Sequence, residues 1–205
     1  MSYYFTNDPQ LEMNRKNISF RFFGVIENFI SDNGVFSKET LDYGSRALLE
    51  TITKLDITGK VLDMGCGIGV IGILLKKYKS DIDLTLIDVN ERAVELTKIN
   101  SQNYKQDNKV ILSDGFTALD DKFDCIVSNP PIRIGKEKLY SLFTQAYEHL
   151  NENGMMYLVI RKQQGAKSAM TYLVELGLKV ELLNKDKGYW IISAKNSWQL
   201  LHKLS

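Results

Sequence analysis

The sequence contains few of the residues that build metal centres, disulfide frameworks or membrane spans. It has two cysteines, Cys66 and Cys125, and two histidines, His149 and His202, among 205 residues. Two thiols without a histidine cluster do not make a metal site, so we predict a reduced chain that holds no metal. No apolar segment approaches the roughly 18 residues of a membrane helix, and the first residues show no secretory signal pattern. We therefore expect a cytoplasmic protein without membrane contact.

The sequence also lacks an excess of one sign of charge. Lysine and arginine number 26 against 25 acidic residues, which gives a net charge of +1. Such a chain has no global field that attracts nucleic acid, so any RNA binding must depend on a local patch. Hydrophobic residues make up 44% of the chain, enough for a substantial core and too many for a disordered protein.

Apolar strand patterns alternate with helical patterns from residue 60 onward. The runs "KVLDMG", "DLTLIDV", "KVILSD", "FDCIVSN" and "MMYLVI" are each followed by a helical or polar stretch. The runs "LKVELLN" and "GYWIISAK" are predicted to form a final antiparallel pair. This alternation predicts an α/β, Rossmann-like fold with a mostly parallel seven-stranded sheet and helices on both faces. We predict this domain over residues 56–196. Residues 1–55 are expected to form an extension of two short strands and a helix packed on the core, and residues 197–205 a tail.

Glycines and acidic residues follow the predicted strands where a ligand is expected. Ligands of parallel α/β sheets bind beyond the carboxyl ends of the strands. The segment "DMGCGIG", residues 63–69, allows a tight turn and a close approach of the backbone to a ligand. Asp63 would oppose a pyrophosphate but suits a cationic amino-acid group. Counted from Gly65, the glycines at 67, 69 and 72 do not follow G-x-G-x-x-G, and this spacing is also taken to disfavour a dinucleotide. A plain strand-to-helix turn is the structural alternative.

Two further aspartates end neighbouring strands. Asp88 can accept hydrogen bonds from both hydroxyls of a ribose, because Asn90 is the better N-cap of the helix that follows. Asp114 can accept from an adenine amine, although a turn aspartate before Gly115 is an equal alternative.

The segments "VLDMGCGIG", "LIDVN", "SDGF" and "VSNPPI", in this order, resemble the class I S-adenosylmethionine-dependent methyltransferases. With "SDNGVFSKETLDYGSRALLE" before them, they are more narrowly similar to the small-subunit ribosomal RNA guanine-N2 methyltransferases and their short single-domain relatives. The resemblance implies S-adenosylmethionine as cofactor, with its methionine part on Asp63, Gly65 and Gly67, its ribose on Asp88 and its adenine on Asp114. The full predicted cofactor site is Asp63, Gly65, Cys66, Gly67, Gly69, Asp88, Val89, Asp114, Gly115 and Asn129.

The stretch Asn129–Pro130–Pro131–Ile132 is the predicted catalytic segment. The lone pair of an exocyclic amine is delocalised and must be freed and aimed at the methyl group. The side-chain carbonyl of Asn129 and the backbone carbonyl of Pro130 can each accept one N–H of the amine. Pro131 stiffens the loop, and no strong base is needed because the methylated amine can lose its proton afterwards. The alternative is a segment that only ends a strand.

The residue after the prolines departs from the commonest pattern of the resembling enzymes. Ile132 stands where many of them have an aromatic residue that stacks on the target, and it offers apolar contact without stacking. Phe36 is the candidate that would supply the missing ring, with core packing as the alternative for it.

The resemblance implies a guanine N2 amine of small-subunit ribosomal RNA as the substrate, so the chain would methylate ribosomal RNA during its processing. A base in a duplex must be flipped out to reach such a site, and RNA needs phosphate contacts. Candidate cations are Arg133, Lys136, Arg161 and Lys162, with a solvated loop as the alternative for the last two. Larger members of the resembling family have a second, degenerate domain before the catalytic one, so recognition through that domain cannot be carried over. Three other functions compete: a protein glutamine-amide methyltransferase, a nicotinamide-dependent oxidoreductase, and a noncatalytic module that keeps the cofactor pocket.

Overall fold

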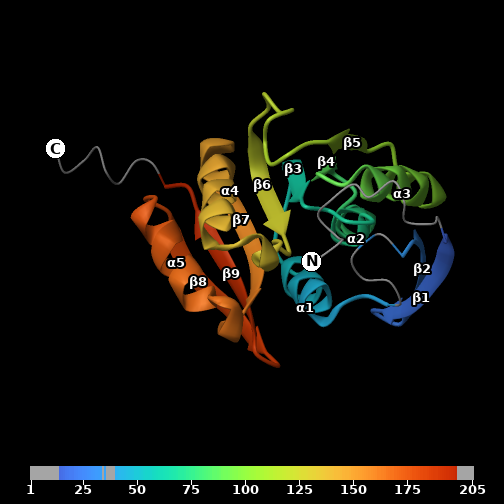
Figure 1. The fold of residues 1–205 in the computed structure, drawn as a ribbon, viewed down its shortest axis with the longest axis horizontal. Coiled ribbons are helices and arrows are strands. Elements are labelled where there is room, and N and C mark those ends of the chain that lie inside the picture. Colours follow the sequence, from blue (N-terminus) through green and yellow to red (C-terminus); the bar gives the residue numbers. More distant parts are fainter. Residues whose placement is uncertain (1–13, 34, 36–39, 198–205) are drawn as a thin grey trace.

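The computed structural model describes residues 14–33, 35 and 40–197. Nine strands are present in this part of the chain, and they form two sheets. A two-stranded antiparallel sheet lies apart from a seven-stranded mixed sheet (Figure 1). The strands are β1 (Lys16–Phe22), β2 (Val25–Ser31), β3 (Gly59–Met64), β4 (Ile82–Asp88), β5 (Lys109–Leu112), β6 (Phe123–Ser128), β7 (Leu150–Arg161), β8 (Lys179–Asp186) and β9 (Tyr189–Lys195).

The seven-stranded sheet has the order β5-β4-β3-β6-β7-β9-β8. The strands β5, β4, β3, β6 and β7 are parallel to their neighbours, and β9 runs antiparallel to both β7 and β8. The carboxyl ends of β3, β4, β5, β6 and β7 therefore meet at one edge. This arrangement confirms the predicted α/β fold and its terminal antiparallel pair.

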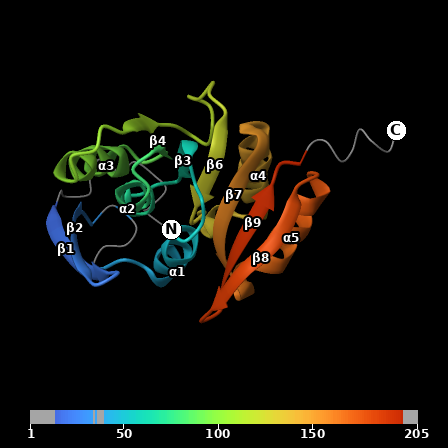
Figure 2. The same ribbon diagram turned by 180° about the vertical axis from the view of Figure 1, so that it is seen from behind.

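Helices cover both faces of the large sheet, as Figures 1 and 2 show from opposite sides. Three of them, from the first half of the chain, pack with the hairpin β1–β2 in one apolar cluster, and two pack in a second cluster across the sheet. Neighbouring strand residues alternate between the clusters, since Val61 faces the first and Leu62 the second. The helices are α1 (Tyr43–Ile52), α2 (Val70–Tyr78) and α3 (Glu91–Asn103) on the first face, and α4 (Lys136–Glu148) and α5 (Ala166–Glu175) on the second, with short 3-10 turns η2 (Ile132–Ile134) and η3 (Lys162–Gln164).

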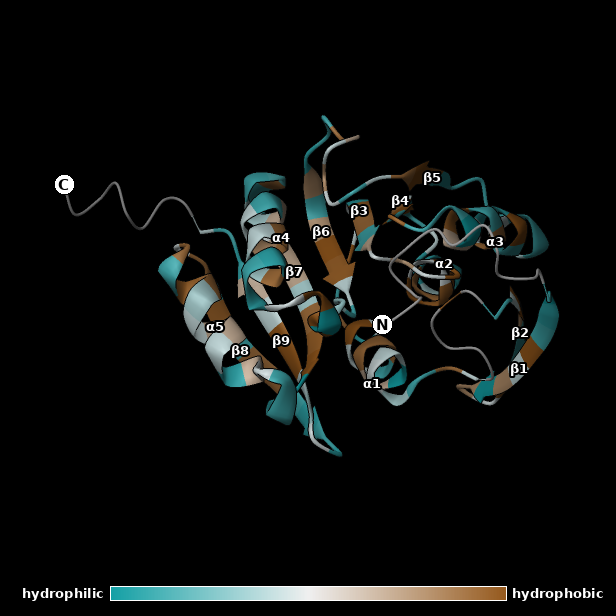
Figure 3. Cartoon of the chain, in the orientation of Figure 1, coloured by the Kyte–Doolittle hydropathy of each residue, from teal (hydrophilic) through white to brown (hydrophobic). Residues whose placement is uncertain are grey.

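The strands and helices follow the hydropathy of the sequence. Figure 3 shows brown, apolar β6 and β9 between helices whose outward faces are teal. The two short strands expected in the extension are present as β1 and β2, joined at Phe23 and Gly24. The strand predicted as "MMYLVI" extends further at both ends in the structure, where β7 begins at Leu150 and ends at Arg161.

A buried asparagine fastens the hairpin to the rest of the molecule. The Asn100 amide accepts a hydrogen bond from Ile30 N at 2.8 Å and donates to the Ile30 carbonyl at 3.0 Å. It also donates to the Ile68 carbonyl in the glycine loop at 2.9 Å. Asn100 thus ties β2 to the segment between β3 and α2. The division of the chain at residue 55 stays a prediction, and Phe36 and residues 198–205 lie outside the described part.

Candidate active site

The glycine loop between β3 and α2 is held against the end of β4. Gly65 N and Cys66 N both donate to the Ile87 carbonyl, at 3.0 and 2.9 Å. Gly65 and Gly67 adopt left-handed backbone conformations, with φ of 71° and 57°. A Cβ at Gly67 would meet nothing within 4 Å, and one at Gly65 would meet only Pro131 Cδ, at 4.0 Å. The loop therefore presents bare backbone to open space next to the predicted catalytic prolines.

The remaining members of the glycine segment serve packing. A Cβ at Gly69 would lie 2.8 Å from Ile73, which leaves no room for a side chain. The Cys66 thiol is buried, 3.7 Å from Thr97 Oγ1, and burial raises its pKa well above the usual value. Both cysteines are buried free thiols in the structure.

Asp63 lies beneath the loop and is fully buried. Its Oδ2 accepts a hydrogen bond from Gly72 N at 2.8 Å, and its Oδ1 has no hydrogen-bond partner. Burial raises the pKa of this carboxyl to about 7. A Cβ at Gly72 would lie 3.0 Å from the Asp63 carboxylate, so this glycine allows α2 to approach β3 closely. Gly72 is thus a packing glycine. With Gly67 and Gly69 it does follow the G-x-G-x-x-G spacing, so the prediction that the glycine spacing disfavours a dinucleotide was wrong.

Asp88 ends β4 with its carboxylate turned toward the glycine loop. Its Oδ2 accepts from Gly67 N at 2.8 Å and its Oδ1 accepts from Asn90 N at 2.9 Å. Burial raises its pKa, and these backbone donors act in the opposite direction. Asn90 caps α3 through hydrogen bonds from Arg92 N and Ala93 N, as the sequence predicts. Since each carboxylate oxygen has about two lone pairs, Asp88 keeps acceptor capacity for a ligand.

The predicted adenine end of the site lies at the ends of β4 and β5. Asp114 is exposed in the turn after β5, and Gly115 beside it has a φ of 57°. Val89 and Leu112 follow or end these neighbouring strands and are 39% and 44% exposed. Exposed apolar side chains at this edge offer a surface for a flat aromatic group. Leu112 is not among the cofactor residues predicted from the sequence, since an apolar residue that ends a strand is usually buried.

Asn129 follows β6 and is anchored by α1. Its Nδ2 donates to Asp42 Oδ1 at 3.2 Å and to Ser45 Oγ at 3.0 Å. Asp42 is also the N-cap of α1, since the same oxygen accepts from Ser45 N at 3.1 Å. A carboxylate only accepts hydrogen bonds, so the NH₂ group must face Asp42 and the Asn129 carbonyl must point elsewhere.

Asp42 and Ser45, which contact Asn129, were not predicted from the sequence as candidate site residues. The signal available in "LDYGS" is that of a helix N-cap, an aspartate followed three residues later by a serine. Nothing in that signal indicates the contact with Asn129.

The prolines fix the loop that carries Asn129. Ser128 Oγ donates to the Met64 carbonyl at 2.6 Å, which joins the ends of β6 and β3. The Pro130 carbonyl accepts from Ile132 N at 2.9 Å, so one of its two lone pairs remains for another donor. Ile132 is partly buried against the second apolar cluster. Its side chain therefore packs toward the second apolar cluster, and it offers no aromatic ring to a substrate.

The four predicted substrate cations occupy two sides of the site. Arg133, in η2, and Lys136, at the start of α4, are exposed, and Lys136 Nζ lies 5.2 Å from the centre of the Tyr140 ring. Arg161 ends β7, with its guanidinium 5.0 Å from the centre of the Tyr189 ring, and Lys162 follows it in η3. Both pairs are at the carboxyl edge of the sheet, as predicted.

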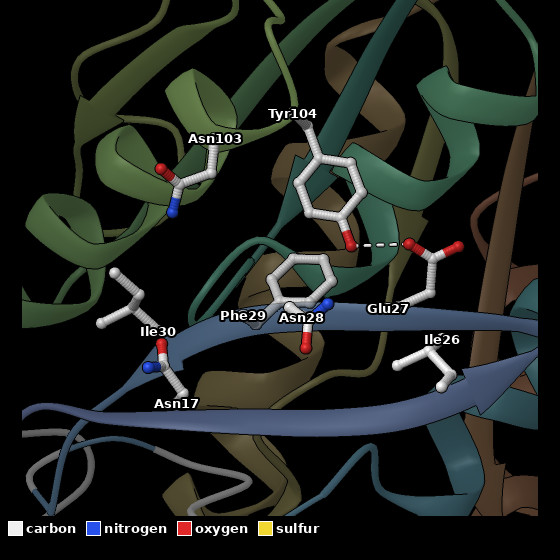
Figure 4. Close-up of a pocket in the computed structure, with 8 residues that line it drawn as sticks. All are labelled: Asn17, Ile26, Glu27, Asn28, Phe29, Ile30, Asn103 and Tyr104. Carbon is white, nitrogen blue, oxygen red and sulfur yellow. Dashed lines mark hydrogen bonds between the residues drawn. The ribbon is translucent and has the colours of Figure 1, made fainter.

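A cavity of about 350 Å³ lies away from this edge, between β2 and the end of α3 (Figure 4). Its acid, Glu27, is 2% exposed and accepts hydrogen bonds from Tyr104 Oη and Lys77 Nζ, both at 2.7 Å. These contacts satisfy the carboxylate, so the cavity shows no unsatisfied chemical group. The carboxyl edge of the sheet remains the candidate site. In the described residues no cluster of metal-ligating side chains occurs, and no helix there is long and apolar enough to cross a membrane.

The strand order and the site at the carboxyl edge define a class I methyltransferase fold. The chain belongs to the Methyltransferase small domain family, whose model matches residues 27–193. Membership confirms the resemblance to class I S-adenosylmethionine-dependent methyltransferases and agrees with the predicted cofactor.

Two relatives and one solved structure are similar to this chain over different shares of their length. Uncharacterized protein YbxB of Bacillus subtilis (strain 168) is 42% identical over 196 residues, which cover 94% of this chain and 98% of YbxB. Ribosomal RNA small subunit methyltransferase C of Haemophilus influenzae (strain PittEE) is 42% identical over 130 residues, 62% of this chain and 39% of that enzyme. The solved T. thermophilus 16S rRNA N2 G1207 methyltransferase (RsmC), in complex with AdoMet and guanosine, superposes with a TM-score of 0.80 and 23% identity over 92% of this chain and 52% of that chain. The chain thus spans about half or less of the named RNA methyltransferases and nearly all of YbxB.

Proposed function

We propose that this protein transfers a methyl group from S-adenosylmethionine to the exocyclic N2 amine of a guanine in small-subunit ribosomal RNA. The observation that carries this proposal is the anchoring of Asn129. Both hydrogens of its amide nitrogen are committed to Asp42 and Ser45. Its carbonyl oxygen is thereby oriented as an acceptor that cannot exchange places with the NH₂ group.

An oriented carbonyl is what an exocyclic amine needs. The amine has two N–H bonds, and Asn129 Oδ1 and the free lone pair of the Pro130 carbonyl would each accept one. Two acceptors fix the plane of the N–H bonds and raise electron density on nitrogen, which favours attack along one direction. S-adenosylmethionine supplies an electrophilic methyl group when bound. The proton of the methylated amine leaves to solvent, so the absence of a strong base from the proposed catalytic segment is consistent with the reaction.

The residues present fit the cofactor. Gly65 and Gly67 leave space beside Pro131 that a side chain would fill, and this space suits the methionine part. Asp88, with acceptor capacity left on both oxygens, would hold the ribose hydroxyls. The exposed Val89 and Leu112 would contact the adenine and Asp114 its amine. Asp63 would support the glycine loop from the protein interior, because its carboxylate is fully buried and accepts a hydrogen bond from Gly72 N.

The substrate proposal is supported by relatives that cover part of the chain. The Haemophilus relative is named as a small-subunit ribosomal RNA methyltransferase, and the superposed T. thermophilus enzyme holds AdoMet and guanosine. Since a guanine in a duplex or stacked loop must be flipped out, the exposed cations Arg133, Lys136, Arg161 and Lys162 would hold the neighbouring phosphates.

Methylation with radiolabelled S-adenosylmethionine tests the proposal. The purified protein is incubated with undermethylated small ribosomal subunits, with the naked RNA, and with a protein extract free of RNA. We expect label in the ribosomal RNA and loss of at least about 100-fold in rate for Asn129→Ala. Label confined to protein would overturn the substrate, and labelling by Asn129→Ala at the wild-type rate would remove Asn129 from the mechanism.

A further inference from the structure

A cluster of cations and aromatic rings lies beside the proposed active site, and it adds Lys185 and Lys187 to the candidate substrate cations Arg161 and Lys162. Its residues, named here the hairpin cluster, are Tyr43, Arg161, Lys162, Lys185, Lys187, Tyr189 and Trp190. We propose that the hairpin cluster binds the phosphate backbone of single-stranded RNA that flanks the target nucleotide. This inference rests on the proposed function and names the surface through which the substrate would be held.

The backbone places the hairpin cluster at the carboxyl edge of the sheet. Ser128, next to Asn129, pairs with Leu158 of β7, and Arg161 ends the same strand three residues later. Arg161 pairs in turn with Tyr189 at the start of β9, and Lys162 N donates to the Gly188 carbonyl at 2.8 Å. The β8–β9 turn therefore projects beyond the edge at which Asn129 lies (Figure 1).

Helix α1 connects the hairpin cluster with the anchored asparagine. Tyr43 directly follows Asp42, the residue that accepts the hydrogen bond of Asn129. The Tyr43 ring lies 5.7 Å from the Tyr189 ring, and a Cβ at Gly44 would lie 2.9 Å from Tyr189. A chain bound across the cluster would thus lead directly to the amine acceptors.

Three cations of the cluster, Arg161, Lys185 and Lys187, rest on aromatic rings, and none of its four cations forms an ion pair with an acid among the described residues. Lys187 Nζ lies 4.6 Å from the centre of the Tyr43 ring, Lys185 Nζ 4.9 Å from that of Trp190, and the Arg161 guanidinium 5.0 Å from that of Tyr189. None of the seven ion pairs formed by the described residues includes a cation of this cluster. The rings orient the charges without cancelling them, which leaves the charges available to an anion.

The acid within the turn is already engaged. Asp186 accepts a short hydrogen bond from the Tyr43 hydroxyl, and this contact raises the pKa of Tyr43 to about 12. Asp186 therefore fixes Tyr43 in place. The turn carries Lys185 and Lys187 against this one acid, and Arg161 and Lys162 lie beside it, so its surroundings are locally positive although the whole chain carries a net charge of only +1.

The turn itself has an unusual residue at its tip. Lys187 and Gly188 both have left-handed φ values, 43° and 82°, as the two central residues of a tight hairpin turn do. Asparagine, aspartate or glycine is the usual first residue of such a turn, and a lysine there is strained. Figure 3 shows this hydrophilic turn at the end of the apolar β9. The turn therefore holds the charge of Lys187 at an exposed tip.

Single-stranded RNA is the anion that fits these features. Evenly spaced phosphates match cations that are spread over the β8–β9 turn and the end of β7. A single strand can feed a flipped base to Asn129 while its neighbours cross the cluster. Cations that are already oriented lose less freedom on binding than mobile ones.

RNA binding by the full chain tests the proposal independently of methyl transfer. Fluorescence anisotropy with a short guanine-containing single-stranded RNA is measured against salt for the wild type, for Lys185→Ala/Lys187→Ala, and for the matched control Lys54→Ala/Lys122→Ala. The control lysines are exposed, one beyond the far end of α1 and one just before the amino end of β6. The charge-preserving variant Lys185→Arg/Lys187→Arg and S-adenosylhomocysteine binding by calorimetry complete the set.

We expect the double alanine variant to bind RNA about 10-fold or more weakly at low salt, with the slope of log K against log salt reduced by about 1.4, which is about 0.7 for each lost contact. The arginine variant and the control should bind like the wild type, and all variants should keep wild-type affinity for S-adenosylhomocysteine. Wild-type RNA binding by the double alanine variant, an equal loss in the control, or tighter binding of the same sequence as a duplex would overturn the proposal. If the wild type shows lysine-dependent RNA binding but labels no RNA, the proposed function fails while this surface stands. If it labels RNA and the double alanine variant does so equally well, the surface fails while the function stands.

Discussion

The side-chain nitrogen of Asn129 donates a hydrogen bond to the Asp42 carboxylate over 3.2 Å, although 87 positions separate the two residues. The same carboxylate oxygen caps α1 by accepting from Ser45 N. One atom therefore joins the start of a helix in the N-terminal part of the chain to the loop after β6. The orientation of the proposed amine acceptor depends on that helix as much as on the prolines beside it.

Removal of the Asp42 carboxylate should release the Asn129 amide. We expect Asp42→Ala to lower kcat by roughly 10- to 100-fold, because one of the two contacts that orient the acceptor is lost. The KM for S-adenosylmethionine should change little. Steady-state methylation kinetics with saturating RNA check this split.

Asp42→Asn is the conservative control for loss of the acceptor. Asp42→Ala also removes an N-cap, at a cost of about 1 kcal/mol in the free energy of unfolding. Asp42→Asn keeps an oxygen that can accept from both Asn129 and Ser45 N, so it should recover most of kcat. A kcat for Asp42→Asn as low as for Asp42→Ala would contradict the positioning role of the hydrogen bond.

Asp88 should control the affinity for the cofactor. Asp88→Asn replaces a charged acceptor by an amide, and loss of a hydrogen bond to a charged group costs about 1.5–3 kcal/mol, so the Kd for S-adenosylhomocysteine should rise about 10- to 150-fold. Calorimetric titration measures it. Asp56→Asn, at an exposed position before β3, is the matched control and should bind like the wild type. An unchanged Kd for Asp88→Asn would remove the residue from the site.

Asp63 should make stability depend on pH. Burial raises the pKa of this carboxyl from 3.8 to about 7, so the folded protein keeps a proton that the unfolded chain releases. Below the lower value both states are protonated and the group has no effect. As pH rises from about 4 to about 7 the free energy of unfolding should fall, by at most about 1.4 kcal/mol per pH unit from this group. Urea unfolding across this window should show a smaller decline for Asp63→Asn than for the wild type. Parallel curves would contradict the raised pKa.

Asn100 should be a strong contributor to stability. Asn100→Ala leaves the Ile30 amide and the carbonyls of Ile30 and Ile68 without their partner in a buried place. We expect a loss of about 2–4 kcal/mol in the free energy of unfolding, measured by urea denaturation. Asn103→Ala, on an exposed turn of the same helix, should cost less than about 0.5 kcal/mol. Equal losses of stability in the two variants would show that helix propensity, and not the buried amide, accounts for the effect.

The carboxyl edge of the sheet, at which the candidate site residues lie, could be predicted from the sequence. Short apolar runs and the glycines that follow them are local patterns, and parallel strands bring their ends together whatever the details of packing. The Asn90 cap of α3 is a local signal of the same kind, and the structure confirms it.

Contacts between segments far apart in the sequence could not be predicted from such local patterns. The contact of Asn129 with Asp42 and Ser45 joins segments whose separate patterns show only a helix cap and a proline turn. The position of Asp63 beneath the loop depends on how closely α2 packs on β3, which Gly72 decides. Lys185 and Lys187 were not predicted as site residues, because their contacts with aromatic rings depend on how the hairpin folds.

Identification of the methylated nucleoside tests the central claim most directly. Small-subunit ribosomal RNA that lacks the modification is treated with the wild-type protein or with Asn129→Ala, digested to nucleosides and analysed by liquid chromatography and mass spectrometry. We predict N2-methylguanosine as the product of the wild type, and a yield lower by at least about 100-fold with Asn129→Ala at equal time. A methyl group on another atom or base, or no methylated nucleoside from a protein that binds S-adenosylhomocysteine, would contradict the account.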